Sequence, residues 1–182
     1  MAAPKPILIV DYDPRWPQMF QEEKQRLEAA LGRWLLGIQH VGSTAVPGLA
    51  AKPIIDIMPG LRSLDDTPRI IGPMRRLGYQ YFPEYEDDLP ARRYFRKPAG
   101  EAFRGGGSHH VHVVETTSEF WRRHIAFRDY LRTHPEAAME YAELKRRLAA
   151  EHGADREGYT EAKTDFIRAI EAKARIPARE NR

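Results

Sequence analysis

The sequence of 182 residues contains no cysteine, which excludes disulfide bonds and thiolate metal sites. It also lacks a long apolar run. The first apolar segment, Pro6–Val10, is followed at once by DYDPRW, and no segment approaches the ~20 apolar residues that a membrane-spanning helix needs. We therefore expect a protein without a membrane segment, located by default in the cytoplasm.

A strong excess of one charge sign is missing as well. The chain carries 29 Lys and Arg against 26 Asp and Glu, a net charge of +3. This excess is too small to indicate nucleic-acid binding, so nucleic acid is not the partner we expect. It is compatible with a local basic pocket for an anionic small molecule. Nothing in the composition indicates an oligomeric state.

What the sequence does contain is the balance of a globular domain: 42% hydrophobic and 30% charged residues. In the first two thirds of the chain, hydrophobic patterns and turn residues predict six strands and two helices. The expected strands are 6–10, 37–41, 53–58, 79–82, 92–97 and 110–115, and the expected helices are 17–35 and 64–77. A glycine-rich connection at 105–107 precedes the last strand. Three further helices are expected at 118–132, 135–151 and 160–174, before a polar end at 176–182.

This order predicts an α/β or α+β fold, in which helices flank a mixed β-sheet and the C-terminal third is helical. We expect a single domain over residues 1–182. Residues 1–116 would form its sheet-containing core, and residues 117–176 would form a helical portion of the same domain.

One segment carries most of the chemical information: residues 40–58 read HVGSTAVPGLAAKPIIDIM. The turn Gly42-Ser43-Thr44 offers backbone amides and two hydroxyls that can hold a phosphate. Lys52 can neutralise a further phosphate oxygen. The alternative is a plain turn in which Ser43 or Thr44 caps a short helix.

Asp56 lies in the apolar strand that follows this turn. A charge in such a strand is unfavourable unless it has a partner. Asp56 is therefore either a carboxylate that binds a metal or handles a proton, or one half of a structural ion pair. The residues alone leave both interpretations open.

Residues 40–57 resemble the signature of the GrpB family, a group assigned to the nucleotidyltransferase superfamily. The resemblance extends along nearly the whole chain, through YDPRWPQMFQEEK, HHVHVV, FRDYLR, YAELKRRLA and YTEAKTDFI. It implies a nucleotidyltransferase fold that binds a nucleoside triphosphate with Mg²⁺ and transfers a nucleotidyl group to an unknown acceptor. It also implies that Gly42 and Ser43 hold phosphates and that Asp56 is a metal-binding, catalytic carboxylate.

The sequence departs from the superfamily pattern at Met58, where a second metal-binding carboxylate is expected. A thioether is a poor ligand for Mg²⁺, which prefers oxygen. The alternative function is therefore a catalytically inactive module that binds a nucleotide or another phosphorylated metabolite. Glu115, at the end of a later strand, is either a substitute carboxylate or a solvated strand-end charge.

His110 and His112 are two residues apart in a predicted strand, so their side chains share one face of it. Such a pair can bind a metal, hold a phosphate or exchange protons. It can equally form a polar sheet face under solvent. With the resemblance, we expect both histidines in the site, where they would orient the acceptor or replace the missing metal ligand.

The C-terminal helices place basic residues on their apolar faces: Arg128, Lys145 and Lys163. Tyr159 lies one turn before Lys163 on the same side. Each cation can lie at the edge of its apolar stripe with its charge in water. Together they indicate a shared anionic partner, which is Asp56 or a bound phosphate.

Two further charged features are predicted. Glu23, on the apolar side of the first helix, is a candidate structural partner for one of these cations. The basic strand RRYFRK at 92–97 is expected to be an edge strand protected by its charges, or to turn one set of its basic side chains toward the pocket.

Overall fold

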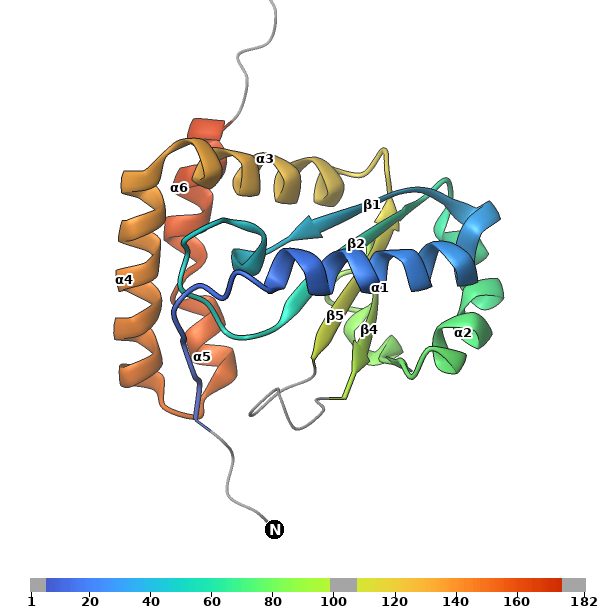
Figure 1. The fold of residues 1–182 in the computed structure, drawn as a ribbon, viewed down its shortest axis with the longest axis horizontal. Coiled ribbons are helices and arrows are strands. Elements are labelled where there is room, and N and C mark those ends of the chain that lie inside the picture. Colours follow the sequence, from blue (N-terminus) through green and yellow to red (C-terminus); the bar gives the residue numbers. More distant parts are fainter. Residues whose placement is uncertain (1–5, 99–107, 175–182) are drawn as a thin grey trace, which may run out of the picture.

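The computed structural model describes residues 6–98 and 108–174 of the chain. Helices surround a single five-stranded sheet (Figure 1). The predicted glycine-rich connection at 105–107 and the polar end at 176–182 lie outside the described residues. No helix in the described ranges is long and apolar enough to cross a membrane.

The sheet is mixed, as predicted. Its strands are β1 (Leu35–Val41), β2 (Ile55–Leu61), β3 (Gln80–Tyr81), β4 (Arg93–Lys97) and β5 (His109–Glu115). They lie in the order β1-β2-β5-β4-β3. β2 and β5 are parallel and the other neighbouring pairs are antiparallel. The two central strands, β2 and β5, are therefore the ones that carry the predicted aspartate and histidines.

Six α-helices accompany the sheet. They are α1 (Trp16–Leu31), α2 (Thr67–Arg76), α3 (Glu119–Thr133), α4 (Pro135–His152), α5 (Arg156–Glu161) and α6 (Thr164–Ala174) in the described part of the chain. Short 3-10 turns occur at Gly32–Trp34, Ser43–Ala45, Leu64–Asp66 and Pro83–Tyr85. Figure 1 shows α1 and α2 beside the sheet and α4, α5 and α6 grouped at one end of it.

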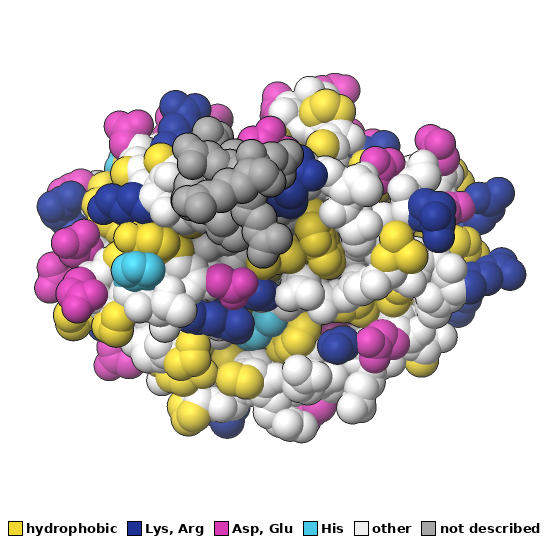
Figure 2. Space-filling view, turned by 90° about the horizontal axis from the view of Figure 1, so that it is seen from above, with side chains coloured by type: hydrophobic (Ala, Val, Ile, Leu, Met, Phe, Trp, Pro, Cys, Tyr) yellow, Lys and Arg dark blue, Asp and Glu magenta, His cyan; other side chains and the backbone are white. Residues whose placement is uncertain are grey.

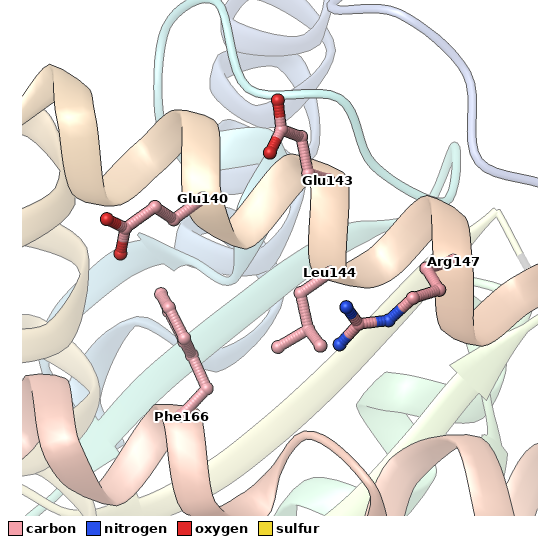
Figure 3. A pocket seen from close by; sticks show the side chains of 5 residues that line it. All are labelled: Glu140, Glu143, Leu144, Arg147 and Phe166. Carbon is pink, nitrogen blue, oxygen red and sulfur yellow. The ribbon is translucent and has the colours of Figure 1, made fainter.

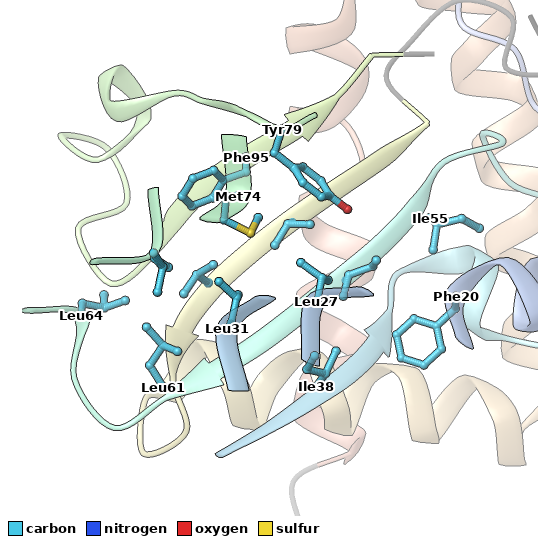
Figure 4. Packing of buried hydrophobic residues seen from close by; sticks show 14 of the residues in the cluster. Phe20, Leu27, Leu31, Ile38, Ile55, Leu61, Leu64, Met74, Tyr79 and Phe95 are labelled. Atoms are coloured by element: carbon cyan, nitrogen blue, oxygen red, sulfur yellow. The ribbon is translucent and has the colours of Figure 1, made fainter. Parts of the chain in front are cut away.

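The main core lies between the sheet and helices α1 and α2 (Figure 4). Leu27 and Leu31, one turn apart on α1, are fully buried there together with Ile57 of β2 and Val111 of β5. The apolar stripe predicted for the first helix is therefore the face that packs on the sheet. Each such side chain contributes about 1.5–3 kcal/mol of hydrophobic stabilisation.

The C-terminal helices pack against the segment that joins β1 to β2. Val46 and Leu49 of that segment share an apolar cluster with Leu131 of α3, Tyr141 of α4 and Ile170 of α6. This packing brings the predicted cations of the helices near the Gly42-Ser43-Thr44 turn, more than 80 residues earlier in the sequence.

Three predicted elements are wrong in detail. Residues 6–10 form no strand, because only Val10 pairs, in an isolated bridge with Ala51. β2 continues past Pro59 to Leu61, since β1 and β5 pair with it on both sides. The expected helix at 160–174 is two helices, α5 and α6. Its break lets Tyr159 and Ile170 pack in different apolar clusters.

Glu23 has a partner, although not the predicted one. Its carboxylate, on the buried side of α1, accepts hydrogen bonds from Lys97 Nζ at 2.9 Å and from the Tyr79 hydroxyl at 3.0 Å. Lys97 belongs to β4, so the expected pairing with a C-terminal helix is wrong. β4 lies between β5 and β3, which also makes the edge-strand prediction wrong.

We expect Glu23→Gln to lower the free energy of unfolding at pH 7 by about 1–3 kcal/mol, because it removes a hydrogen-bonded charge from the core. Burial opposes ionisation of Glu23, but the hydrogen bond and charge of Lys97, the charge of His109 and the Tyr79 hydrogen bond together outweigh it and hold the carboxyl pKa below its usual value. This stabilisation is therefore present above a pH of about 4 and disappears as the pH falls further.

Urea unfolding between pH 3 and pH 7 measures this difference. Glu22→Gln, at an exposed neighbouring position, is the control and should leave stability nearly unchanged. If Glu23→Gln lowered the free energy of unfolding by the same amount at pH 3 as at pH 7, the charged interaction would be contradicted.

Candidate functional site

The predicted turn and the predicted aspartate are in direct contact. Val41, the last residue of β1, lies opposite Asp56 in the antiparallel pair of β1 and β2. Gly42 follows with a φ of 70°. A Cβ atom on Gly42 would lie 2.5 Å from Oδ2 of Asp56. Both the positive φ and this close approach require glycine, so the turn can lie against the carboxylate only with glycine at this position.

Asp56 and the two histidines share one face of the sheet. β2 and β5 are parallel, and Asp56 lies opposite His110. Oδ1 of Asp56 is 3.4 Å from His112 Nε2 and 3.7 Å from His110 Nδ1. The Asp56 side chain keeps 27% of its surface exposed. Its contacts with the two histidines therefore leave part of the side chain open to solvent.

The charges of this group are set by its surroundings. Burial disfavours the ionised form of Asp56, but the His112 hydrogen bond and the charges of both histidines and Lys52 outweigh it and lower the carboxyl pKa. Burial lowers the pKa of His110 to about 4, although Asp56 opposes this shift. At neutral pH an ionised Asp56 thus faces a neutral His110.

Lys145 reaches the turn from α4. Its ammonium group donates to Ser43 Oγ at 2.9 Å and to the Ala50 carbonyl oxygen. The residue is only 3% exposed and forms no ion pair with a carboxylate in the described part of the chain. Burial, and then the charges of Lys163 and Arg146, lower the pKa of Lys145 to about 7. A buried ammonium without a counterion favours a bound anion.

Lys52 and Lys163 complete a cluster of three lysines with Lys145. Their ammonium groups lie 5.3 Å and 4.2 Å from the ring centre of Tyr159, which holds both by cation–π contact. Burial and the charge of Lys52 lower the pKa of Lys163 to about 8, and Asp56 opposes this shift. Tyr159 is itself buried. It therefore contacts both lysines through its ring, and the charges of Lys52 and Lys163 interact with Asp56.

Two residues assigned to phosphate binding are engaged elsewhere. Thr44 donates its hydroxyl hydrogen to the Ile54 carbonyl oxygen at 3.1 Å and lies 3.0 Å from His40 Nε2. Arg128 donates to Gln39 Oε1 and the His40 carbonyl oxygen and pairs with Asp129. Both side chains therefore support the end of β1 and the turn that follows it, and phosphate binding by Thr44 and Arg128 stays a prediction.

Sequence reasoning missed His40. Its ring stacks on Phe20, with the ring centres 4.6 Å apart, and its Nε2 must donate to Thr44 because the Thr44 hydrogen is already given to Ile54. Burial lowers its pKa to about 4, so it is neutral. In the sequence, only its position just before Val41-Gly42 pointed to a place near the site. The residue on which it stacks, Phe20, belongs to α1 and could not be predicted locally.

The position expected for a second carboxylate belongs to the core. Met58 is fully buried in a cluster with Val41, Val114 and the α3 residues Phe120 and Trp121. Glu115 does not replace it, since it lies opposite Leu61 at the far end of β2 and accepts from the Leu64 amide. Leu61 lies five residues beyond Asp56 along β2, a distance of roughly 16 Å.

A resident metal does not fit this group. In the described residues no set of three or more His, Asp or Glu side chains is arranged to hold a metal ion. Mg²⁺, however, is often bound through one or two carboxylates together with substrate phosphates. Asp56, with its partly exposed side chain, fits that second arrangement.

Two further features of the surface bear on anion binding: a pocket and the distribution of basic side chains. An open pocket between α4 and α6 is lined by Glu140, Glu143, Leu144, Arg147 and Phe166 (Figure 3), and it contains no predicted site residue. Its two glutamates would repel a phosphate. On the face shown in Figure 2, the described basic and acidic side chains are interspersed, so they form no continuous basic surface there.

Comparison with known proteins gives a family. The model of the family described as GrpB protein matches residues 6–173. The chain belongs to the GrpB family. A crystal structure of the conserved protein GrpB from Enterococcus faecalis is 37% identical in sequence, with a TM-score of 0.80, and the match covers 92% of this GrpB chain and 96% of that one.

Curated relatives extend this finding. The UPF0157 protein YqkA of Bacillus subtilis is 39% identical over 167 residues, which are 92% of the GrpB chain. The chain spans only 47% of the length of YqkA. A protein named dephospho-CoA kinase from Mycolicibacterium paratuberculosis is 28% identical over 181 residues, covering 90% of this chain and 44% of the kinase.

The contact between Gly42 and Asp56 can be tested by adding one methyl group. Gly42→Ala should lower the free energy of unfolding by more than Gly48→Ala. Gly48 has a similar φ of 78°, but no atom lies near its missing Cβ. The positive φ alone should cost about 1–2 kcal/mol in either variant. Only Gly42→Ala also displaces the carboxylate.

Denaturant unfolding of Gly42→Ala, Asp56→Ala and the double variant measures the coupling between the two sites. We expect the double variant to be less destabilised than the sum of the single ones. Additive effects would show that the methyl group does not press on Asp56.

Lys145 should make stability depend on pH. Its folded pKa of about 7 lies below that of an unfolded lysine, so folding releases a proton between pH 7 and pH 9. The free energy of unfolding should therefore rise as the pH increases from 7 to 9, and this gain should be lost as the pH decreases to about 7. The slope from one such lysine is at most about 1.4 kcal/mol per pH unit.

We expect Lys145→Met to reduce this slope, while Lys173→Met, at an exposed position of α6, should leave it unchanged. Urea midpoints measured at pH 7, 8 and 9 would show the difference. An identical slope in Lys145→Met and the native protein would rule out a neutral buried Lys145.

Proposed function

We propose that this GrpB protein binds a nucleoside triphosphate at the turn, the lysine cluster and Asp56, and transfers its nucleotidyl group to an acceptor. The observation that carries this proposal is the buried ammonium of Lys145, bonded to Ser43 and unpaired with any described carboxylate. A polyanion supplies the missing counterions for all three lysines. The resemblance to nucleotidyltransferases supports a triphosphate as that polyanion.

The β- and γ-phosphates would lie between the turn and the lysines. The amides of Ser43 and Thr44 start a 3-10 turn and donate to no acceptor in the described part of the chain. They and Ser43 Oγ supply neutral donors, while Lys52, Lys145 and Lys163 supply charge. Mg²⁺ bound to the triphosphate would take one ligand from Asp56 and would neutralise charge that develops on the phosphates.

The reaction is a substitution at the α-phosphorus. An acceptor oxygen forms a bond to this phosphorus, the bond from it to the bridging oxygen of the β-phosphate breaks, and pyrophosphate leaves with the electron pair. The acceptor proton passes to the neutral imidazole of His110. The lysines stabilise the leaving pyrophosphate, so the protein contributes chiefly positioning and electrostatic stabilisation.

A second function is favoured by one observation, the burial of Met58. Because this position lies in the apolar core beneath α3, a second carboxylate has no place there. A protein with a single carboxylate can still bind the magnesium complex of a nucleotide. The protein is then a binding module for a nucleotide or another phosphorylated metabolite, and no chemistry follows.

Calorimetric titration of the four common nucleoside triphosphates, with and without Mg²⁺, tests the first step. We expect binding that needs Mg²⁺ and that Asp56→Ala abolishes. Lys145→Gln and Lys163→Gln should each weaken it about tenfold or more, the effect of losing one charge-assisted hydrogen bond. Lys173→Gln is the matched control and should change the affinity by less than a factor of two.

Release of pyrophosphate in the presence of an acceptor panel then separates the two functions. Turnover that is lost in His110→Ala and Asp56→Ala supports the enzyme. Binding without turnover over a wide panel supports the module. Failure of the nucleoside triphosphates and of every other phosphorylated compound tested to bind would contradict both.

A further inference from the structure

Arg92, just before β4, and Arg96, within it, pair with no carboxylate in the part of the chain that the structure describes, and both face the candidate site. Tyr94 of β4 lies opposite His112 of β5, and Arg96 lies opposite His110. Because side chains alternate along a strand, Arg96 shares the face of Tyr94 and the two histidines. Arg92, two residues before Tyr94, lies on that face as well, with its Nη1 3.5 Å from His112 Nδ1.

Arg92 is incompletely bonded. Its Nε is buried and has no hydrogen-bond acceptor in residues 6–98 and 108–174. The guanidinium carbon lies 4.7 Å from the ring centre of Tyr94. A buried, unpaired guanidinium N–H is a rare and unfavourable arrangement unless a ligand supplies the acceptor.

Arg96 contacts two aromatic rings. Its guanidinium carbon lies 3.9 Å from the ring centre of Phe82 and 5.8 Å from that of Tyr94. It forms no ion pair with a described carboxylate. The aromatic contacts hold the guanidinium, and no hydrogen bond within residues 6–98 and 108–174 occupies its N–H groups, which are arranged to bind phosphate or carboxylate oxygens in pairs.

The other basic residues of the same strand behave differently. Arg93 pairs with Glu86 at 3.3 Å, and Lys97 pairs with Glu23 at 2.9 Å. Both belong to the opposite side of β4. The basic side chains on the core side of β4 are therefore neutralised, whereas Arg92 and Arg96, on the side that faces His110, have no carboxylate counterion among the described residues.

The lysine cluster and these arginines lie on different sides of the carboxylate. Ser43, the contact of Lys145, follows β1 on one side of Asp56. Arg92 and Arg96 lie on the other side, beyond β5, two strand spacings or about 10 Å from β2. The site thus has room for two anionic groups with Asp56 and the histidines between them.

We propose that Arg92, Arg96 and Tyr94 form a second anion-binding subsite that receives the acceptor. This inference rests on the proposed function, in which the lysine side holds the triphosphate. It identifies the acceptor as a small molecule that carries a phosphate or carboxylate group near its reacting hydroxyl. The two arginines bind this group, and the hydroxyl then lies beside His110 and Asp56.

Titration of ¹⁵N-labelled protein with inorganic phosphate, followed by NMR, tests the subsite. The buried Nε–H of Arg92 reports on this side, and the Ser43 amide reports on the lysine side. We expect both signals to shift and saturate. Repeating the phosphate titration with a non-hydrolysable nucleoside triphosphate and Mg²⁺ present should block the response of Ser43 and preserve that of Arg92.

The variants separate the two sides. Arg96→Gln should weaken the phosphate response at Arg92 about tenfold or more, the effect of losing one charged hydrogen-bond donor. It should leave the response at Ser43 unchanged. Lys145→Gln should do the reverse. Arg93→Gln, which removes a charge from the other face of β4, is the matched control and should affect neither response.

Several results would overturn the subsite. One is an Arg92 signal that does not saturate with phosphate, or that chloride shifts equally at the same ionic strength. Another is displacement of phosphate from Arg92 by the nucleotide analogue, which would place part of the nucleotide, and not the acceptor, against the arginines. A saturable Arg92 response beside a silent Ser43 amide would instead retain the subsite and contradict triphosphate binding at the lysines.

Discussion

The contact between a glycine and a carboxylate organises the candidate site. Gly42 has no Cβ, and this allows the turn after β1 to lie directly against Asp56 on the neighbouring strand. The carboxylate is held between the turn on one side and two histidines on the other. Any side chain at position 42 would separate the turn from the acid, and the groups proposed to bind anions would no longer surround Asp56.

Around this contact the protein gathers more positive charge than it neutralises. The lysines come from the segment before β2, from α4 and from the residue that precedes α6, and the arginines come from β4 and its approach. Elsewhere the fold pairs its buried charges, as it pairs Glu23 with Lys97. The contrast indicates that the uncompensated cations are not a by-product of packing, since the same strand pairs its other basic side chains.

Much of the fold could be predicted from local patterns. The apolar stripe of α1 and the alternation of buried and partly exposed residues in β5 are strong periodic signals, and both elements form where these signals predict them. Predictions failed where pairing partners decide the outcome. β2 continues through Pro59-Gly60 because strands lie on both sides of it. Residues 6–9 form no strand because no described strand lies beside them, and only Val10 makes a bridge, to Ala51.

The sequence by itself determined the chemical inventory: a glycine turn, one strand aspartate, a pair of histidines on one face, and lysines on apolar helix faces. Only the tertiary structure decided which of these meet. Lys145 reaches Ser43 across 102 residues, whereas Arg128 and Thr44 are taken up by backbone carbonyls and neighbouring side chains. The hydrogen-bond partners of these side chains depend on which donors and acceptors packing brings within about 3 Å of each other. A local sequence pattern contains no information on that distance.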